Sequence, residues 1–544
     1  MATTVLPAPG GSGRWSPEAR RTGTRREVSA SDPFAHKYVI AATVTLAAML
    51  ELIDTSIVNV AVPHMMGNLG ATLDEVAWVS TGYIIANVIV ISMSAWLSAF
   101  FGRRRYFAGS IALFVIASFF CGASRTLGTL VLWRVVQGVG GGALLSTAQA
   151  ALREAFPLEE IGTAMAIFGV GVMVGPTIGP TLGGWIVDSY SWSWIFYINV
   201  PLGIAAFVLT LAYLRDNAHQ DRARRIDVTG IVLLTLGVGA LQWMLERGER
   251  SDWFQSPFIV ALATTALVSG ALLIWRELHT AEPIINLRIL KNRQVTAGVS
   301  IGLMLGFALY GSVFILPVFL QSVLQMTAWQ TGKIILPGAL ASAVTMAVVG
   351  RNAGKLDARY TVLAGTLLYF AAMWQMSLAT AVSGAGDFFW PLILRGVGLG
   401  LIFVPLTNAT IADLDPRNLA QGTGMFNLFR QLGGSLGIAI MATMLAHLRT
   451  IERSNLVQHI AVGDPHVTAR LGAIAGGVVA RGVQPALARD VATAILDRQI
   501  ELQASILAFS RLYLYSGLAL VAALPLLFLF KTGKAIGTGA ADAH

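Results

Sequence analysis

Two acidic residues, Glu51 and Asp54, lie three positions apart inside an apolar stretch that begins near residue 38. Three positions is close to one helical turn, so both side chains share one face of a helix. Charged groups within a membrane are expensive, and transport proteins place them where ions or protons pass. Burial and mutual repulsion both oppose ionisation of the pair. One of the two is therefore expected to bind and release a proton, and Asp54 is favoured.

Three cations, Arg134, Arg395 and Arg430, lie inside other apolar stretches. A guanidinium keeps its proton, so each of them needs a hydrogen-bond acceptor nearby. Arg134 is expected to face Asp54, either as its partner in proton coupling or as a static ion pair. For Arg395, a structural role in bracing helices through hydrogen bonds explains the residue as well as a functional role does. Arg511 starts the last apolar stretch and is expected to extend toward the membrane surface.

Polar and aromatic side chains within the apolar stretches are candidates for the lining of a substrate cavity. Each of them suits a hydrogen bond to a neighbouring helix equally well. The set comprises Asn59, Asn87, Gln137, Tyr310, Phe314, Gln321, Trp374, Asn408, Asn427 and Gln431, together with Arg430.

A segment rich in glycine and proline, GVGVMVGPTIGPTLGG, begins at Gly169. Small residues every three or four positions allow close contact between helices, and prolines remove backbone donors and bend a helix. The segment is expected to act as a hinge or a seal, with tight packing alone as the alternative.

The composition is typical of a membrane protein. Of 544 residues, 55% are hydrophobic and 12% are charged, and the mean hydropathy is +0.66. The net charge of +9 lies in short connections, without a recognition module for nucleic acid. A single cysteine, Cys121, excludes an intrachain disulfide and a metal site of several thiolates, and it is expected simply to pack.

Sequence motifs of hydrolytic or ATP-driven chemistry are missing. The sequence contains no HExxH or Walker GxxxxGK[ST] pattern, so an enzyme is not predicted and no cofactor is expected. An ion gradient is the remaining source of energy, and one proton entering down 100 mV supplies about 2.3 kcal/mol.

About fourteen apolar stretches are long enough to cross roughly 30 Å of hydrocarbon. They lie near 38–62, 76–98, 104–123, 127–152, 160–184, 193–214, 227–246, 257–277, 296–322, 331–351, 358–381, 388–412, 421–446 and 506–530. Lys and Arg concentrate in every second short connection, as at Arg103, Arg288 and Arg351. Because cytoplasmic connections retain such residues, both termini are predicted to be cytoplasmic.

Two pairs of similar segments suggest a duplicated six-helix unit. LWRVVQGVGGGALLS from Leu132 resembles LILRGVGLGLIFVPL from Leu392, and GRRRYF from Gly102 resembles GRNAGKLDARY from Gly350. The register requires two inserted helices, which gives six plus two plus six. The predicted parts are a disordered cytoplasmic tail 1–36, a bundle 37–215, two linker helices 226–278, a bundle 294–530 and a cytoplasmic tail 531–544.

A long polar stretch, 447–505, separates the last two predicted spans. Leu487, Val491 and Ile495 recur within it at helical spacing and indicate an amphipathic helix. This helix is expected to lie on the bilayer or on the transporter itself, or else to form a docking surface for a partner.

Three motifs resemble those of the major facilitator superfamily, and specifically of its fourteen-helix drug/proton antiporter branch, the EmrB/QacA family. They are LIDTSIVNVAVP from Leu52, RVVQG from Arg134 and GPTIGPTLGG from Gly175. The resemblance implies an all-α integral membrane protein that exports amphiphilic compounds by alternating access while protons move inward. It also implies that Asp54 is the coupling carboxylate and Arg134 its partner, with a hinge at Gly175, Pro176, Gly179, Pro180, Gly183 and Gly184.

The same resemblance implies a bacterial inner-membrane location in contact with lipid, with a periplasmic adaptor and an outer-membrane channel reached through 447–505. Two departures stand out. The superfamily's usual acidic and basic pair falls on Ala99 and Phe100, which puts its cytoplasmic latch in doubt. Asn427 and Gln431 stand where related antiporters carry acidic residues, so the proton stoichiometry is lower or Glu51 takes over part of the role.

Other functions remain open at this point. A dedicated exporter of one endogenous metabolite, lipid or siderophore would share all these motifs. A membrane sensor without transport activity is disfavoured, because Glu51, Asp54 and Arg134 are expensive to keep within lipid.

Overall fold

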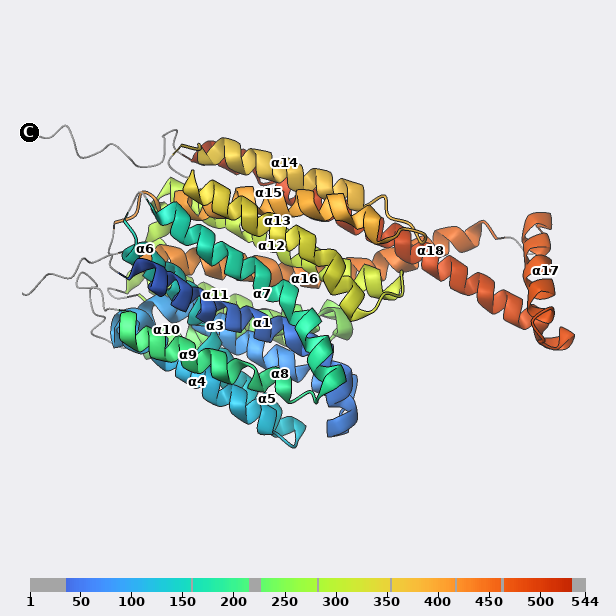
Figure 1. Cartoon of the computed structure of the whole chain (residues 1–544), viewed down its shortest axis with the longest axis horizontal. Coiled ribbons are helices and arrows are strands. Elements are labelled where there is room, and N and C mark those ends of the chain that lie inside the picture. Colours follow the sequence, from blue (N-terminus) through green and yellow to red (C-terminus); the bar gives the residue numbers. More distant parts are fainter. Residues whose placement is uncertain are drawn as a thin grey trace, which may run out of the picture.

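The computed structural model describes residues 36–157, 160–214, 227–280, 283–352, 355–415, 418–460 and 464–530. The predicted tails, apart from residue 36, lie outside these ranges. Every regular element within them is a helix. Figure 1 shows a bundle of long helices, from which one hairpin extends well beyond the rest.

The first half of the bundle comprises α1 (Lys37–Leu69), α2 (Leu73–Val76), α3 (Trp78–Phe101), α4 (Arg103–Ala123), α5 (Leu127–Gly141), α6 (Leu144–Ala155), α7 (Ile161–Ser189), α8 (Trp194–Tyr197) and α9 (Asn199–Tyr213). Two inserted helices follow, α10 (Val228–Arg247) and α11 (Pro257–His279). The second half comprises α12 (Arg293–Ser322), α13 (Ala328–Arg351), α14 (Ala358–Met376), α15 (Ala385–Ile411), α16 (Leu419–Gln458), α17 (Pro465–Val479) and α18 (Pro485–Val521).

Each predicted apolar stretch coincides with helix. Over the described residues, twelve helical spans are long and apolar enough to cross a membrane. The two further stretches correspond to α7, which packs along α1 and α13, and α14, which packs along α15 and α18. The structure therefore bears out a multi-span helical membrane protein, while fourteen spans and the cytoplasmic termini stay predictions.

Each half has its own apolar core, and α7 connects the two. Ile161 and Met165 at the start of α7 belong to the apolar cluster of the second half. Further along α7, a Cβ on Gly169 would meet the Met346 side chain of α13, and Gly350 of α13 is in tight contact with the backbone of Gly162. Close approach of these helices thus holds the halves together at one end.

The polar stretch 447–505, predicted as a long periplasmic loop, is helical over most of its described residues, and its periplasmic location stays a prediction. α16 continues to Gln458 and α18 begins at Pro485, so both helices extend beyond the bundle with α17 across their tip (Figure 1). Hydropathy marks where lipid ends, but a helix continues wherever its backbone hydrogen bonds do. We call residues 447–505 the projection.

Ion pairs join the two long helices of the projection. Arg453 contacts Asp497 at 2.7 Å, and Arg449 contacts Glu501 at 2.5 Å. Arg511 pairs with Glu452 at 2.5 Å, so its expected extension toward the membrane surface is replaced by an interhelical ion pair.

The predicted amphipathic helix is present, as the first part of α18, but its apolar face is rotated. Ala488 and Ala492 are buried on the face that packs against α17, whereas Leu487 is 53% exposed. This helix belongs to the projection, where it packs on α17 of the same chain, and whether it also lies on the bilayer or docks a partner stays a prediction.

Candidate functional site

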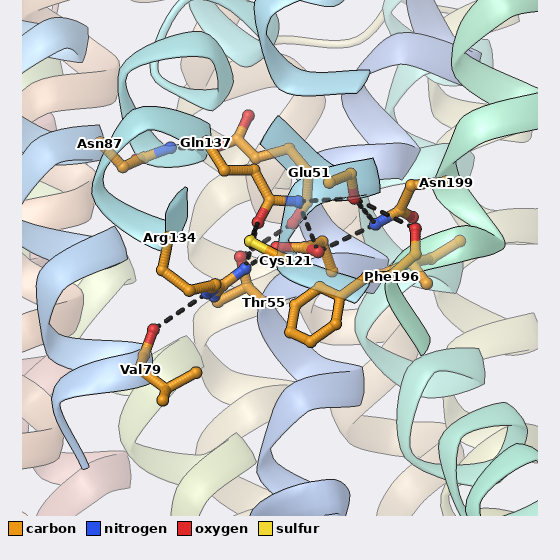
Figure 2. A network of polar contacts seen from close by, with 12 residues as sticks. Glu51, Thr55, Val79, Asn87, Cys121, Arg134, Gln137, Phe196 and Asn199 are labelled. Atoms are coloured by element: carbon orange, nitrogen blue, oxygen red, sulfur yellow. Dashed lines mark hydrogen bonds and ion pairs between the residues drawn. The ribbon is translucent and has the colours of Figure 1, made fainter. Parts of the chain in front are cut away.

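The two acidic residues of α1 are both buried, and Asp54 has a complete set of partners. Its Oδ2 accepts a bond of 2.5 Å from Nη1 of Arg134 on α5. Its Oδ1 accepts bonds of 2.9 Å from Nε2 of Gln137 and Nδ2 of Asn199. Figure 2 shows these groups converging from three helices. The expectation that Arg134 faces Asp54 is confirmed.

The guanidinium of Arg134 is held on several sides. Its Nε donates to the carbonyl of Val79 at 2.9 Å, and Nη1 also donates to Oε1 of Gln137 at 2.7 Å. The ring of Tyr83 lies 4.2 Å from its central carbon. A buried ion pair becomes favourable only when its remaining lone pairs and protons are satisfied in this way.

A second layer of hydrogen bonds orients the amides around Asp54. Ser118 on α4 accepts from Nε2 of Gln137 at 2.9 Å and from Nδ2 of Asn199 at 3.0 Å, and it donates to the carbonyl of Phe196 at 3.1 Å. The Sγ of Cys121 lies 3.7 Å from Oε1 of Gln137, so this cysteine does more than pack. The network ties α1 to α4, α5 and α9.

Sequence reasoning missed Ser118 and Asn199. A serine in a transmembrane helix is too common to stand out. Asn199 had a usable signal, since it is an asparagine inside the predicted span 193–214, two residues after the aromatic run WSWIFY.

Glu51 differs from Asp54 in its surroundings. It is 5% exposed, and its Oε1 accepts a bond of 3.0 Å from Nδ2 of Asn87. Its Oε2 has no hydrogen-bond partner. Within the described part of the chain, no ion pair includes Glu51. The site therefore contains one carboxyl with partners on both oxygens, including a cation, and one that forms no ion pair.

A second polar cluster lies where α16 meets the first half. Nδ2 of Asn427 donates to Oε1 of Gln149 on α6 at 2.6 Å, and both side chains are buried. Arg430, one turn further along α16, donates from Nη1 to the hydroxyl of Tyr310 at 2.9 Å. Gln149 was not among the predicted residues.

Several predicted cavity residues lie elsewhere. Gln321 is exposed near the end of α12, and Trp374 is 55% exposed on α14, so neither joins the cluster. Phe314 and Gln431 are half-buried, and Phe314 packs on the core of the second half. Asn408, also half-buried, lies on α15 with Oδ1 lacking a partner.

The side chains of Asn59 and Pro176 lie outside the described residues. Whether Asn59 belongs to the cavity and Pro176 to the hinge stays a prediction.

The glycines of the fifth predicted span form a ridge that packs on α1. A Cβ on Gly175 would lie 2.9 Å from Cβ of Leu52, and a Cβ on Gly183 would lie 2.7 Å from Cγ1 of Ile57. Gly179 faces Ser56 in the same way.

The rest of this motif is less constrained. Pro180 is half-buried, and a Cβ on Gly184 would have only Cγ1 of Val60 within reach, at 3.9 Å. The helix runs without a break from Ile161 to Ser189. The motif thus places α7 directly against the helix that carries Glu51 and Asp54.

The altered connection between α3 and α4 is filled by other contacts. The ring of Phe100 stacks on Trp96 at 5.4 Å, and Ala99 is half-buried. Arg103, which follows them, pairs with Glu154 of α6. An ion pair within the first half therefore lies where the superfamily's usual pair is missing.

Comparisons with known proteins agree with this architecture. The family profile of the Major Facilitator Superfamily matches residues 44–438. The multidrug export protein EmrB of Escherichia coli K12 is 33% identical over 514 residues, covering 94% of this chain and 98% of that protein. The fatty acid resistance protein FarB of Neisseria gonorrhoeae is 31% identical over 89% of this chain and 94% of that protein.

Solved structures give the same fold at low sequence identity. The human organic anion transporter MFSD10 has a TM-score of 0.55 at 13% identity, covering 89% of this chain and 99% of its own. A bacterial homologue of the human lysosomal transporter Spinster has a TM-score of 0.52 at 16% identity, with 92% and 97% covered. With its helical bundle, its buried intramembrane charges and its matched profile, this chain belongs to the Major Facilitator Superfamily.

Proposed function

We propose that this chain is a proton-coupled antiporter that exports hydrophobic and amphiphilic small molecules across the bacterial inner membrane. Similar proteins are named for multidrug export, for fatty acid resistance and, in Acinetobacter baumannii, for colistin resistance. Fatty acids and colistin are both amphiphilic, which supports amphiphilic compounds as the proposed cargo. The proton gradient replaces any cofactor as the source of energy.

The proposed topology has fourteen spans arranged as six, two and six, with both termini cytoplasmic. α7 and α14 complete the count, since each packs lengthwise along candidate spans. α10 and α11 pack on each other and, through Leu234 and Trp96, on α3. The positions of Lys and Arg in alternate connections support the orientation.

The observation that carries the proposal is the difference between Glu51 and Asp54. A buried carboxyl with an unpartnered oxygen and no counter-ion is far less costly when it holds a proton. Asp54 accepts from three donors, one of which is the cation Arg134, so its charge is compensated. Glu51 is therefore the proposed proton carrier, and the Asp54–Arg134 pair is the scaffold that positions it. This reverses the sequence-based preference for Asp54.

The glycine ridge of α7 couples movement of α1, which carries the proposed proton site, to the helices of the cargo pathway. Ser56 lies two residues after Asp54 on α1 and faces Gly179 of α7, while α7 also packs on α13 of the second half. A shift of α1 on protonation of Glu51 would have to move α7, because there is no free space between them. The hinge role of the motif follows from this contact.

The projection is the proposed contact for a periplasmic adaptor, which in turn would join an outer-membrane channel. Its two long helices present an extended surface beyond the bundle (Figure 1). Between α16 and α18 lies a groove of about 730 Å³, lined by residues that include Thr450, Arg453 and Val457. Such a surface has no role within the bundle itself.

The test is transport of ethidium into inverted proteoliposomes with an imposed proton gradient, comparing wild type with Glu51→Gln. Uptake that depends on the gradient and is lost in Glu51→Gln is expected. The matched control is Glu277→Gln, which removes a fully buried carboxyl from α11. Gradient-independent uptake, or equal loss in the control, would contradict Glu51 as the carrier.

A further inference from the structure

The buried guanidinium of Arg430 lies on α16 of the second half, which packs against α3 and α6, the helices that enclose Glu51, and it has no counter-ion among the described residues. Arg430 is 1% exposed, its Nε has no hydrogen-bond partner, and its only polar contact among the described residues is with Tyr310. No ion pair of the described chain includes it. A cation in this state is costly, so its persistence points to a ligand that compensates it.

Helix geometry places Arg430 close to the level of Glu51. Glu51 is enclosed by Asn87 of α3 and by the backbone at Leu145 of α6, and both helices pack against α16. Leu145 lies one turn before Gln149, which contacts Asn427, and Arg430 lies one turn after Asn427.

The two helices run in opposite directions (Figure 1). Going from Gln149 back to Leu145 moves about 6 Å along α6. Going from Asn427 forward to Arg430 moves about 4.5 Å along α16, in the same direction because the helices are antiparallel. Arg430 is accordingly the cation whose charge acts on Glu51 across the interface, although the two form no ion pair.

Side chains at this interface carry both hydrogen-bond donors and hydrogen-bond acceptors that have no partner. Oε2 of Glu51 and Oδ1 of Asn427 lack donors, whereas Nε of Arg430 and Nε2 of Gln149 lack acceptors. All four side chains are at least nine-tenths buried. Such a set is complementary to a ligand that carries a donor at one end and an acceptor at the other.

We propose that Glu51 and Arg430 together bind the head group of a zwitterionic amphiphile, with its ammonium at Glu51 and its carboxylate at Arg430. This inference rests on the proposed export function and names its cargo class. Tyr310 orients the guanidinium, and Asn427 and Gln149 complete the head-group site across the two halves.

Antiport favours this class of cargo over a simple anion. Exchange requires that the proton and the cargo exclude each other from the carrier. An anion bound at Arg430 would favour a proton on Glu51, so the two would travel together. An ammonium group competes with the proton for the Glu51 carboxylate, while the cargo's carboxylate compensates Arg430.

The test uses three fluorescent ligands that share one dansyl group. They are ε-dansyl-lysine, which is zwitterionic, its methyl ester, which is cationic, and its Nα-acetyl derivative, which is anionic. Binding to purified protein in detergent is followed by dansyl fluorescence, without any gradient. Wild type is expected to bind the zwitterion about tenfold more tightly than either derivative, because each lost charge-assisted hydrogen bond costs about 1.5 kcal/mol or more.

Each variant should remove one of the two preferences. Arg430→Gln should lose the preference over the methyl ester and keep that over the acetyl derivative, whereas Glu51→Gln should do the reverse. Arg395→Gln is the matched control, since Arg395 is a buried cation near Tyr369 and Tyr513 in the second half. It should keep both preferences.

Equal binding of all three ligands by wild type would overturn the inference, and so would an unchanged ligand order in Arg430→Gln. If Arg430→Gln does not fold, Arg430→Lys replaces it and should weaken the carboxylate preference without abolishing it, because a lysine lacks the planar fork. If gradient-driven transport fails, only the antiport proposal is contradicted, because ligand selectivity is measured at equilibrium without a gradient. Transport without zwitterion preference would sink only this inference.

Discussion

Glu51 and Asp54 lie one helical turn apart on α1, yet only Asp54 contacts a cation, at 2.5 Å from Arg134. The partners of Asp54 come from α5 and α9, while Glu51 faces Asn87 of α3. Equal spacing in sequence has therefore produced two unlike environments. One carboxyl is joined to α5 and α9 by an ion pair and hydrogen bonds, and the other keeps one oxygen without a partner.

The first prediction concerns stability. Asp54→Asn should destabilise the protein by about 3–5 kcal/mol, because it leaves Arg134 as an uncompensated buried charge. Glu51→Gln should have a much smaller effect, since Glu51 forms no ion pair and the amide oxygen of glutamine can still accept from Asn87. Denaturant unfolding of both variants in detergent checks the difference. Similar losses in both would mean that the two carboxyls share a structural role.

The second prediction concerns the contact between α1 and α7. Gly179→Ala should cost about 1–3 kcal/mol and slow transport, because the added methyl group overlaps Ser56. Ser56→Gly in the same chain should restore stability by removing the obstructing hydroxymethyl group. Gly184→Ala is the control, as only Val60 approaches that position, at 3.9 Å. Thermal unfolding and transport rate are measured together, and no rescue by Ser56→Gly would refute the contact.

The third prediction concerns the projection. Arg453→Glu removes two ion pairs to α18, with Asp497 at 2.7 Å and Glu501 at 3.3 Å, and replaces them with repulsion. Exposed pairs contribute about 0.2–1 kcal/mol each, so the change should be local. Hydrogen exchange should accelerate at the end of α16 and the start of α18 without a change in the bundle. Adding Asp497→Arg should slow it again by restoring an ion pair of reversed sign, and unchanged exchange in the single variant would count against the paired helices.

The fourth prediction concerns pH and the start of α10. Asp227 accepts from the backbone N–H of Gly230 at 2.9 Å and from Nη2 of Arg276 at 2.7 Å, and these bonds, chiefly those from Arg276, lower its pKa. A carboxyl whose pKa is lowered in the folded state adds stability above its unfolded pKa and loses it as pH falls through the folded one.

Asp227→Asn keeps an N-cap side chain but loses the ion pair with Arg276, so it should cost about 0.2–1 kcal/mol at neutral pH, the usual value of a partly exposed pair. The difference from wild type should begin to shrink below about pH 4, near the ordinary pKa of an aspartate. Unfolding measured from pH 7 downward checks it, with Asp387→Asn as a control at another helix start. A constant difference across the range would contradict the ion-pair contribution.

Much of the architecture was predictable, because membrane insertion imposes simple rules on sequence. Each expected apolar stretch coincides with helix, and Arg134 faces Asp54 as its intramembrane position suggested. The projection was not predictable from hydropathy, since α16 and α18 continue as helix where their apolar residues end. Gln321 and Trp374 were misplaced for a related reason: a polar or aromatic residue in a span does not reveal which way it faces.

The sequence by itself determined the membrane class, the superfamily and the presence of costly buried charges, because each follows from local residue types and spacing. Only the tertiary structure decided which carboxyl has a counter-ion. That outcome depends on Gln137, Ser118 and Asn199 converging from three helices on Asp54, and on Arg430 approaching Glu51 from the other half. Hydrogen bonds act over about 3 Å, so they are settled by how helices pack and not by distance along the chain.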